Sequence, residues 1–338
     1  MEEALYYNAL ALRAGGDRET LSKLRRPFTN WESACKAVTT PSYPTIAAEW
    51  QKLERAGVRL ILREDADYPL LLAEIADPPF GIYVMGKLPA ADTLAIVGTR
   101  GASPDGKNIA CRFARELARS GFAIVSGLAF GIDAAAHEGC LEAGGQTVAV
   151  LAGGLHDIYP RENARLAGKI LANGGAIISE YPMGAPPYAS RFLERNRIIS
   201  GLSRGVLIVE APIGSGSLAT ARRALDQNRD VFVVPGPIAH RNFHGSHSLI
   251  RQGAELVADP REIMEAYGLG REEKISVASR TASKEEMLIL KALGAADMPM
   301  DVDKIAAITK LEPRITNQLL AFLVTKDLVK DESGGYTI

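Results

Sequence analysis

The chain has 338 residues, enough for two or three domains, and 39 lysines and arginines face 40 acidic residues, for a formal net charge of −1. This balance gives no support for polyanion binding by itself, so a nucleic-acid site would need a local group of cations. No apolar run is long enough to cross a bilayer, the first residues (MEEALYYNAL) are acidic where a signal peptide is basic, and the three cysteines lie far apart. We therefore expect a cytoplasmic protein with no membrane association, disulfide framework or metal site.

The first segment, residues 1–62, has the pattern of several short helices. The first helical run ends at Gly15 and Gly16, a plausible C-terminal cap, and residues 44–62 indicate a helix that runs into a strand. The glycines of RAGGDRET do not have the spacing of a DNA-binding hairpin. We predict a small helical domain of the SAM or helix-hairpin-helix type that serves in packing or oligomerisation.

The middle of the chain, residues 63–269, alternates apolar runs with amphipathic segments. The runs predicted as strands are TLAIVG, FAIVSG, QTVAVLAGG, GAIISE, GVLIVEA and DVFVVPG. Continuous apolar strands separated by helices indicate an α/β fold with a doubly wound, mostly parallel, Rossmann-like sheet. Ligands bind beyond the carboxyl ends of such strands, which are the places to search for a site.

The last part of the chain differs in composition from the middle. Residues 270–283 are polar and lack periodicity, so they are predicted to form a linker. Residues 284–338 indicate three helices, the last beginning near Pro313, and a hairpin around Gly334 and Gly335. This order is typical of a winged-helix domain, whose low basic density leaves protein contact and duplex binding both open.

The first strong strand leads to Thr99 and Arg100, followed by a loop of small residues and a helix. The loop has neither the dinucleotide-binding glycine spacing nor a Walker lysine. The guanidinium of Arg100 suits a phosphate, although a carboxylate partner at the sheet edge is the alternative. We favour the phosphate role.

A second turn, SGLAFGIDAAAH, places Ser126, Gly127 and Gly131 where backbone N–H groups could hold a phosphate. Asp133 and His137 follow on one face of the next helix. They could form a catalytic pair, but no nucleophile matches them. We predict that they support the structure.

A third segment, residues 190–203, combines cations with an aromatic ring. Arginines interleaved with aromatics suit a single-stranded nucleic acid, whereas the alternative is a salt-bridged helix surface. The predicted contact residues here are Arg191, Phe192, Arg195, Asn196 and Arg197.

A fourth segment, VEAPIGSGSLATARRAL, turns from a strand into a helix. Glu210 ends the strand and is predicted to be structural. The helix start would point N–H groups at an anion, with small donors from Ser215, Gly216, Ser217 and Thr220.

Taken in order, IVGTR, SGLAFGIDAAAH, GGLHDIYPREN, ISEYP, FLERNRIISGLS, VEAPIGSGSLATA, VFVVPGPI and LIRQGA resemble the DNA-processing protein A (DprA, or Smf) family. The resemblance implies an extended Rossmann-like domain that binds single-stranded DNA without a cofactor, forms a homodimer and loads the RecA recombinase during natural transformation. Three positions depart from the family pattern: Thr99 stands for serine, His247 for asparagine and Ala189 for a basic residue.

The leading hypothesis is thus a non-enzymatic mediator that binds and protects incoming single-stranded DNA and loads RecA. The alternative is a Rossmann-like hydrolase of nucleoside monophosphates, favoured by GSGSLATA beside Glu210.

Overall fold

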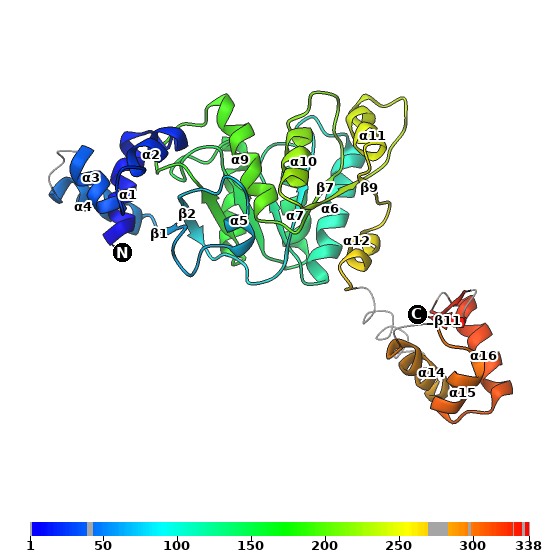
Figure 1. Cartoon of the computed structure of the whole chain (residues 1–338). Helices are drawn as coiled ribbons and strands as arrows, with labels where there is room; N and C mark the ends of the chain where they lie inside the picture. Colours follow the sequence, from blue (N-terminus) through cyan, green and yellow to red (C-terminus); the bar gives the residue numbers. More distant parts are fainter. Residues whose placement is uncertain are drawn as a thin grey trace. The chain divides into compact units, whose positions relative to one another are not determined.

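The computed structural model describes residues 2–38, 43–269, 283–296, 299–326, 328–332 and 335–337 (Figure 1). The chain forms two compact units, Met1–Pro260 and Arg261–Ile338. The linker predicted over residues 270–283 lies, apart from Ser283, outside the described residues.

The N-terminal segment contains the helices α1 (Glu2–Arg13), α2 (Arg18–Arg25), α3 (Trp31–Val38) and α4 (Tyr43–Arg55). Gly15 and Gly16, both with positive φ, end α1, and the carboxylate of Asp17 caps α2 by accepting a hydrogen bond from the Thr20 N–H at 2.7 Å. Trp31 packs edge-on against Phe80 at 5.4 Å, so these helices share a hydrophobic core with the sheet that follows.

Within the described residues, nine strands form one sheet in the order β1-β2-β6-β5-β4-β3-β7-β8-β9. The six predicted strands are confirmed as β3 (Thr93–Val97), β4 (Ala123–Ser126), β5 (Thr147–Val150), β6 (Ala176–Ser179), β7 (Gly205–Ile208) and β8 (Asp230–Val233). All six are parallel. The sheet is extended by β1 (Val58–Leu62) and β2 (Gly81–Gly86), which pair antiparallel, and by the short parallel β9 (Glu255–Leu256).

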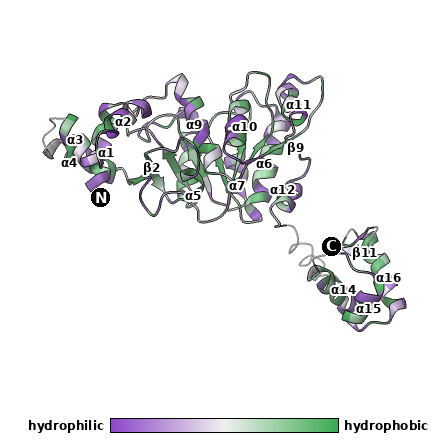
Figure 2. Cartoon of the chain, in the orientation of Figure 1, coloured by the Kyte–Doolittle hydropathy of each residue, from purple (hydrophilic) through white to green (hydrophobic). Residues whose placement is uncertain are grey.

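Both faces of the sheet are buried, as the continuous apolar strands predicted. Alternate residues of one strand belong to different cores: Val148 and Val150 to one, Ala149 to the other. The strands are accordingly green in Figure 2, while purple residues lie on the outer helix surfaces. The covering helices are α5 (Leu70–Ala73), α6 (Pro104–Arg119), α7 (Ile132–Glu142), α8 (Ala164–Ala172), α9 (Ala189–Gly201), α10 (Gly216–Asp226) and α11 (His244–Arg251). Helix α12 (Pro260–Ala266) follows β9.

The order of the strands reverses at β3. This strand pairs with β4 on one side and with β7 on the other, so the chain winds outward in both directions from it. In doubly wound sheets a crevice opens at such a point, between the carboxyl ends of the two strands. The loops that follow β3 and β7 are therefore placed to build a binding site.

The second unit contains α14 (Lys284–Gly294), α15 (Val302–Thr309), α16 (Pro313–Thr325) and the hairpin β10 (Lys330–Glu332) and β11 (Gly335–Thr337). Ser283 and Glu286 form a reciprocal capping box at α14. Pro313 is in the first turn of α16, where its missing N–H costs nothing, as predicted. Leu290, Ile305 and Leu320 fill the core of this unit.

Candidate nucleic-acid interface

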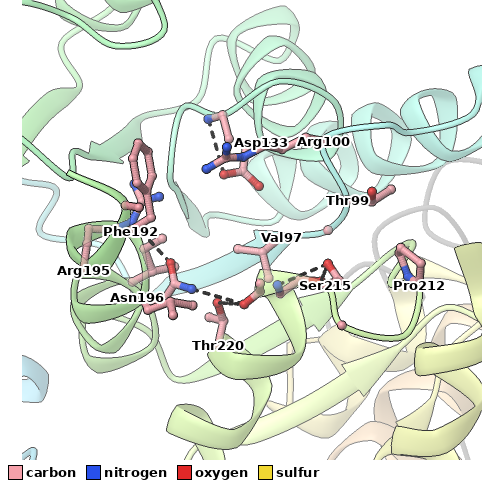
Figure 3. Close-up of a pocket in the computed structure, with 18 of the residues that line it drawn as sticks. Val97, Thr99, Arg100, Asp133, Phe192, Arg195, Asn196, Pro212, Ser215 and Thr220 are labelled. Atoms are coloured by element: carbon pink, nitrogen blue, oxygen red, sulfur yellow. Dashed lines mark hydrogen bonds between the residues drawn. The ribbon is translucent and has the colours of Figure 1, made fainter. Parts of the chain in front are cut away.

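A cleft of about 690 Å³ lies at the predicted point, beyond the carboxyl ends of β3 and β7 (Figure 3). It combines the loop after β3, the start of α9 and the loop that opens α10. Its lining includes Gly98, Thr99, Arg100, Asp133, Tyr159, Phe192, Leu193, Arg195, Asn196, Ile213, Ser215, Gly216, Ser217 and Thr220. The first, third and fourth predicted segments therefore meet in one place.

Arg100 is exposed at the mouth of this cleft. Its guanidinium carbon lies 4.8 Å from the centroid of the Phe192 ring, and the Phe192 ring in turn meets Tyr159 edge-on at 5.7 Å. Among the described residues no carboxylate lies within the 4.0 Å of an ion pair to Arg100. The structure therefore contradicts the alternative in which Arg100 is paired with a carboxylate. Its guanidinium is available to a ligand.

The start of α10 forms the opposite wall. Ser215 caps the helix, its Oγ accepting from the Ser217 N–H at 3.3 Å and lying 2.7 Å from the Ser217 Oγ. A Cβ built on Gly216 meets nothing within 4 Å, so the backbone there is open to a ligand. Thr220 lines the cleft one turn later, with Oγ1 3.5 Å from the Gly216 carbonyl oxygen. Small residues at a helix N-terminus are suited to an anion.

The second predicted cradle needs correction. The N–H of Gly127 donates to Asp133 Oδ2 at 3.1 Å, and the N–H of Ala129 lies 3.4 Å from the same atom. Ser126 is fully buried, and its hydroxyl donates to the Ile96 carbonyl at 2.7 Å. The N–H groups of this turn hold an internal carboxylate and the Ser126 hydroxyl bonds to β3, so we propose neither Ser126 nor Gly127 as a DNA contact.

Gly131 has a conformational role. Its φ is 79°, and a Cβ would lie 2.3 Å from the Thr99 carbonyl oxygen. Only glycine lets the start of α7 approach the strand loop that carries Arg100. Gly131 therefore helps to position the loop of Thr99 and Arg100 that lines the cleft.

Asp133 and His137 do not contact each other through hydrogen bonds. Burial raises the pKa of Asp133, against the opposing effect of the Arg195 charge and two N–H donors. Burial lowers the pKa of His137 to about 3. Because the Thr147 hydroxyl donates to the Ile124 carbonyl, His137 Nδ1–H donates to Thr147 Oγ1 at 2.7 Å. His137 is thus a neutral core residue, and the geometry gives no catalytic pair.

The α9 arginines occupy three different environments. Arg195 is buried beneath the cleft: it donates to the carbonyls of Gly127, at 2.9 Å, and Val150, and burial lowers its pKa to about 10. The Nε–H of Arg195 donates to the side-chain oxygen of Asn196 at 3.3 Å. The Nδ2 of Asn196 in turn donates to the Gly216 carbonyl at 3.2 Å. This pair ties the Gly127 turn to the start of α10.

The two other arginines lie away from the cleft. Arg191 donates to the Pro186 carbonyl at 2.7 Å and to the Gly15 carbonyl at 2.5 Å, joining the loop before α9 to the N-terminal helices. Arg197 is 4% exposed and paired with Glu180 and Asp77. Both arginines were predicted to contact DNA. Each guanidinium already has protein partners, so we do not propose either residue as a contact.

Glu210 is fully buried behind the cleft. Its carboxylate accepts from the Ser103 N–H at 2.9 Å, from the Ser103 hydroxyl and from Asn242 Nδ2 at 2.9 Å. A Cβ on Gly106 would lie 2.5 Å from the carboxyl carbon, so α6 approaches closely. Glu210 therefore fixes the loop after β3.

Of the three positions interpreted as departures from the family pattern, two line the cleft and one does not. Thr99 lies in the cleft, and its Oγ1 accepts from the Gly101 N–H at 3.2 Å. Ala189 is exposed on the cleft lining as the first residue of α9, and no charge comes from this position. His247 is remote: its Nε2 is 3.0 Å from the Gly236 carbonyl oxygen.

Tyr159 is a cleft residue that was not predicted as a site residue, although it lies within the motif GGLHDIYPREN. It is 48% exposed and borders Phe192, although 33 residues separate the two in sequence. The motif gave a signal, but nothing in the sequence showed that its tyrosine would reach Phe192. The cleft also includes the exposed apolar side chains of Leu193 and Ile213.

The described residues hold no group of three or more His, Cys, Asp or Glu side chains that could bind a metal ion. None of the described helices has both the length and the apolar content to cross a membrane.

The family model for DNA recombination-mediator protein A matches residues 59–268. The chain belongs to this family. The matched segment contains every residue of the cleft.

Relatives support the assignment over longer stretches. Protein Smf of Escherichia coli is 48% identical over 220 residues, which are 64% of this chain and 59% of the relative, so the chain matches less than two thirds of that protein. Protein Smf of Synechocystis is 39% identical over 83% of this chain and 76% of the relative.

Solved structures of the family have the same fold. DNA processing protein A of Streptococcus pneumoniae superposes with a TM-score of 0.63 at 35% identity, over 77% of this chain and 92% of that one. The Helicobacter pylori protein, in a structure described as giving its single-stranded DNA binding mode, has a TM-score of 0.56 at 31% identity, over 62% of this chain and 95% of that one.

Proposed function

We propose that this protein binds single-stranded DNA in the cleft at the β3–β7 switch point. The observation that carries the proposal is the exposed guanidinium of Arg100, without a carboxylate partner in the described part of the chain, stacked on Phe192. A cation for the phosphates and a ring face for a base are the two components of a sequence-tolerant single-strand site. The start of α10 at Ser215 and Gly216 adds a second phosphate position.

The proposed role is that of a recombination mediator that protects incoming single-stranded DNA and loads RecA in the cytoplasm during natural transformation. Family membership supports this role. We further propose that the protein acts as a homodimer and that residues 284–338 are a winged-helix accessory domain, in keeping with the three helices and hairpin.

We propose no enzymatic activity. The hydrolase alternative relied on Glu210 beside the GSGSLATA loop, but its carboxylate is buried and occupied by Ser103 and Asn242. The carboxylate that does line the cleft, that of Asp133, accepts backbone N–H groups. A candidate general base must reach its proton in the substrate, and neither group is free to do so.

The experiment is fluorescence anisotropy with a labelled oligo(dT) strand and a duplex of equal length, each titrated over a range of salt. Tighter binding to the single strand, weakening as salt rises, is the expected result. Equal affinity for the two would reject the proposal.

A second experiment tests the hydrolase alternative. Incubation with nucleoside monophosphates should release no base, and turnover would support the hydrolase alternative. Loading is tested by comparing RecA filament formation on single-stranded DNA that another protein coats, in the presence and in the absence of the protein described here.

A further inference from the structure

Three basic residues form a stripe on the outside of α8 and the 3-10 turn before it. Arg161, Arg165 and Lys169 are spaced four residues apart, and all three are exposed. Residues four apart lie on one face of a helix. The opposite face is buried through Leu166 and Ile170, so the stripe faces solvent.

Cations outnumber acids along the stripe, and none of its cations is held in an ion pair with a described residue. Between residues 158 and 179 the sequence has these three cations and one acid, Glu162. In the part of the chain that the structure describes, none of the three cations lies within 4.0 Å of a carboxylate. An uncompensated row of this kind attracts a polyanion.

The stripe begins two residues after a residue that lines the cleft. Tyr159, two residues before Arg161, lines the cleft, is 48% exposed and contacts Phe192. Helix α8 follows β5 and precedes the parallel β6, so it runs from the cleft edge of the sheet toward the opposite edge. Arg161 therefore lies nearest the cleft and Lys169 farthest, about 12 Å further along the helix.

We propose that single-stranded DNA leaving the cleft passes over Tyr159 and continues along Arg161, Arg165 and Lys169. This path rests on the proposed function of the cleft and extends it. Tyr159 offers a ring for a base where the strand leaves Phe192, and the three cations contact successive phosphates. Charge that tracks the backbone next to aromatic side chains is the arrangement that holds a single strand.

The path predicts a dependence on length. An oligonucleotide of about 6 nucleotides fills the cleft alone, whereas one of about 20 also reaches α8. The test variant carries Arg165→Ala and Lys169→Ala. The control carries Arg119→Ala and Arg251→Ala, which change charge equally at exposed positions at the ends of α6 and α11, away from α8.

We expect the test variant to bind the long oligonucleotide roughly tenfold more weakly than wild type at about 0.1 M salt, with a salt slope lower by about 0.7 for each phosphate that the protein no longer neutralises. Binding of the short oligonucleotide should be unchanged, and the control should match wild type on both. If the test variant also matches wild type on the long strand, the path is wrong while the cleft stands. If wild type binds neither strand, the proposed function fails and the path with it.

Discussion

The guanidinium of Arg100 lies over the ring of Phe192, 4.8 Å from its centroid, at the mouth of the switch-point cleft. One residue comes from the loop after β3 and the other from α9, so the contact depends on the assembled fold. The aromatic ring orients the guanidinium, and because no carboxylate among the described residues neutralises it, its positive charge remains available to a phosphate.

Phe192→Ala should weaken single-stranded DNA binding by about fivefold to a hundredfold, because a base can no longer stack there and Arg100 loses its support. Phe192→Tyr keeps a ring and should retain most of the affinity. Anisotropy with oligo(dT) measures both. Equal affinities for wild type and Phe192→Ala would show that no base stacks there.

Gly216→Ala separates function from stability. The added methyl group meets no protein atom within 4 Å, so the free energy of unfolding should change by less than about 0.5 kcal/mol. The methyl would stand where a phosphate approaches the start of α10, and affinity should fall about fivefold. Urea unfolding and anisotropy on one preparation check both. Unchanged affinity would remove α10 from the site.

Gly131→Ala should destabilise the fold by about 2–4 kcal/mol, because a residue with a side chain must adopt a φ of 79° and its Cβ would lie 2.3 Å from the Thr99 carbonyl oxygen. The midpoint of urea unfolding measures this loss. An unfolding midpoint like that of Gly216→Ala would mean that the turn relaxes freely.

Arg197→Ala should destabilise the protein by about 3–5 kcal/mol, since it leaves Glu180 buried without its partner. Arg100→Ala should leave stability within about 0.5 kcal/mol, since that side chain is exposed. Thermal and urea unfolding compare the two. Similar effects of both substitutions on stability would contradict the environments described for them.

His137 should make stability depend on pH. Its pKa is about 3 in the folded protein, against an ordinary value of 6.5 for a solvated histidine. Between these values the unfolded chain binds a proton that the native state does not, so stability falls as the pH drops from about 6.5 toward 3, by up to about 1.4 kcal/mol per pH unit.

The control for this pH dependence is His137→Asn, which keeps a donor toward Thr147 and does not titrate. Its stability should fall less steeply over the same range, although its absolute stability is lower. The difference between the two proteins isolates the histidine, because Asp133 and Glu180 titrate in both. Parallel curves would indicate that His137 is protonated in the native state.

The sheet was predictable because its strands are buried on both faces and read as continuous apolar runs. β2 and β9 were not predicted: β2 extends the sheet antiparallel, and β9 has only two residues, both exposed. The place of the cleft followed from the rule for doubly wound sheets, and residues after β3 and β7 line it.

The roles of individual residues were harder to predict. Arg195 and Arg197 are two positions apart, which turns them about 200° around a helix, so both could not face one cleft. The N–H groups of the Gly127 turn were interpreted as a phosphate cradle, but Asp133 provides the anion from within the chain. Sequence shows the donors of such a turn and does not show which acceptor reaches them.

The most direct measurement is oligo(dT) anisotropy across salt for Arg100→Ala beside Arg119→Ala, an exposed cation at the far end of α6. Arg100→Ala should weaken binding about tenfold to a hundredfold and lower the salt slope, as expected when a charge-assisted hydrogen bond to a phosphate is removed, while Arg119→Ala matches wild type. Equal binding by all three proteins would contradict the assignment of the cleft as the DNA site.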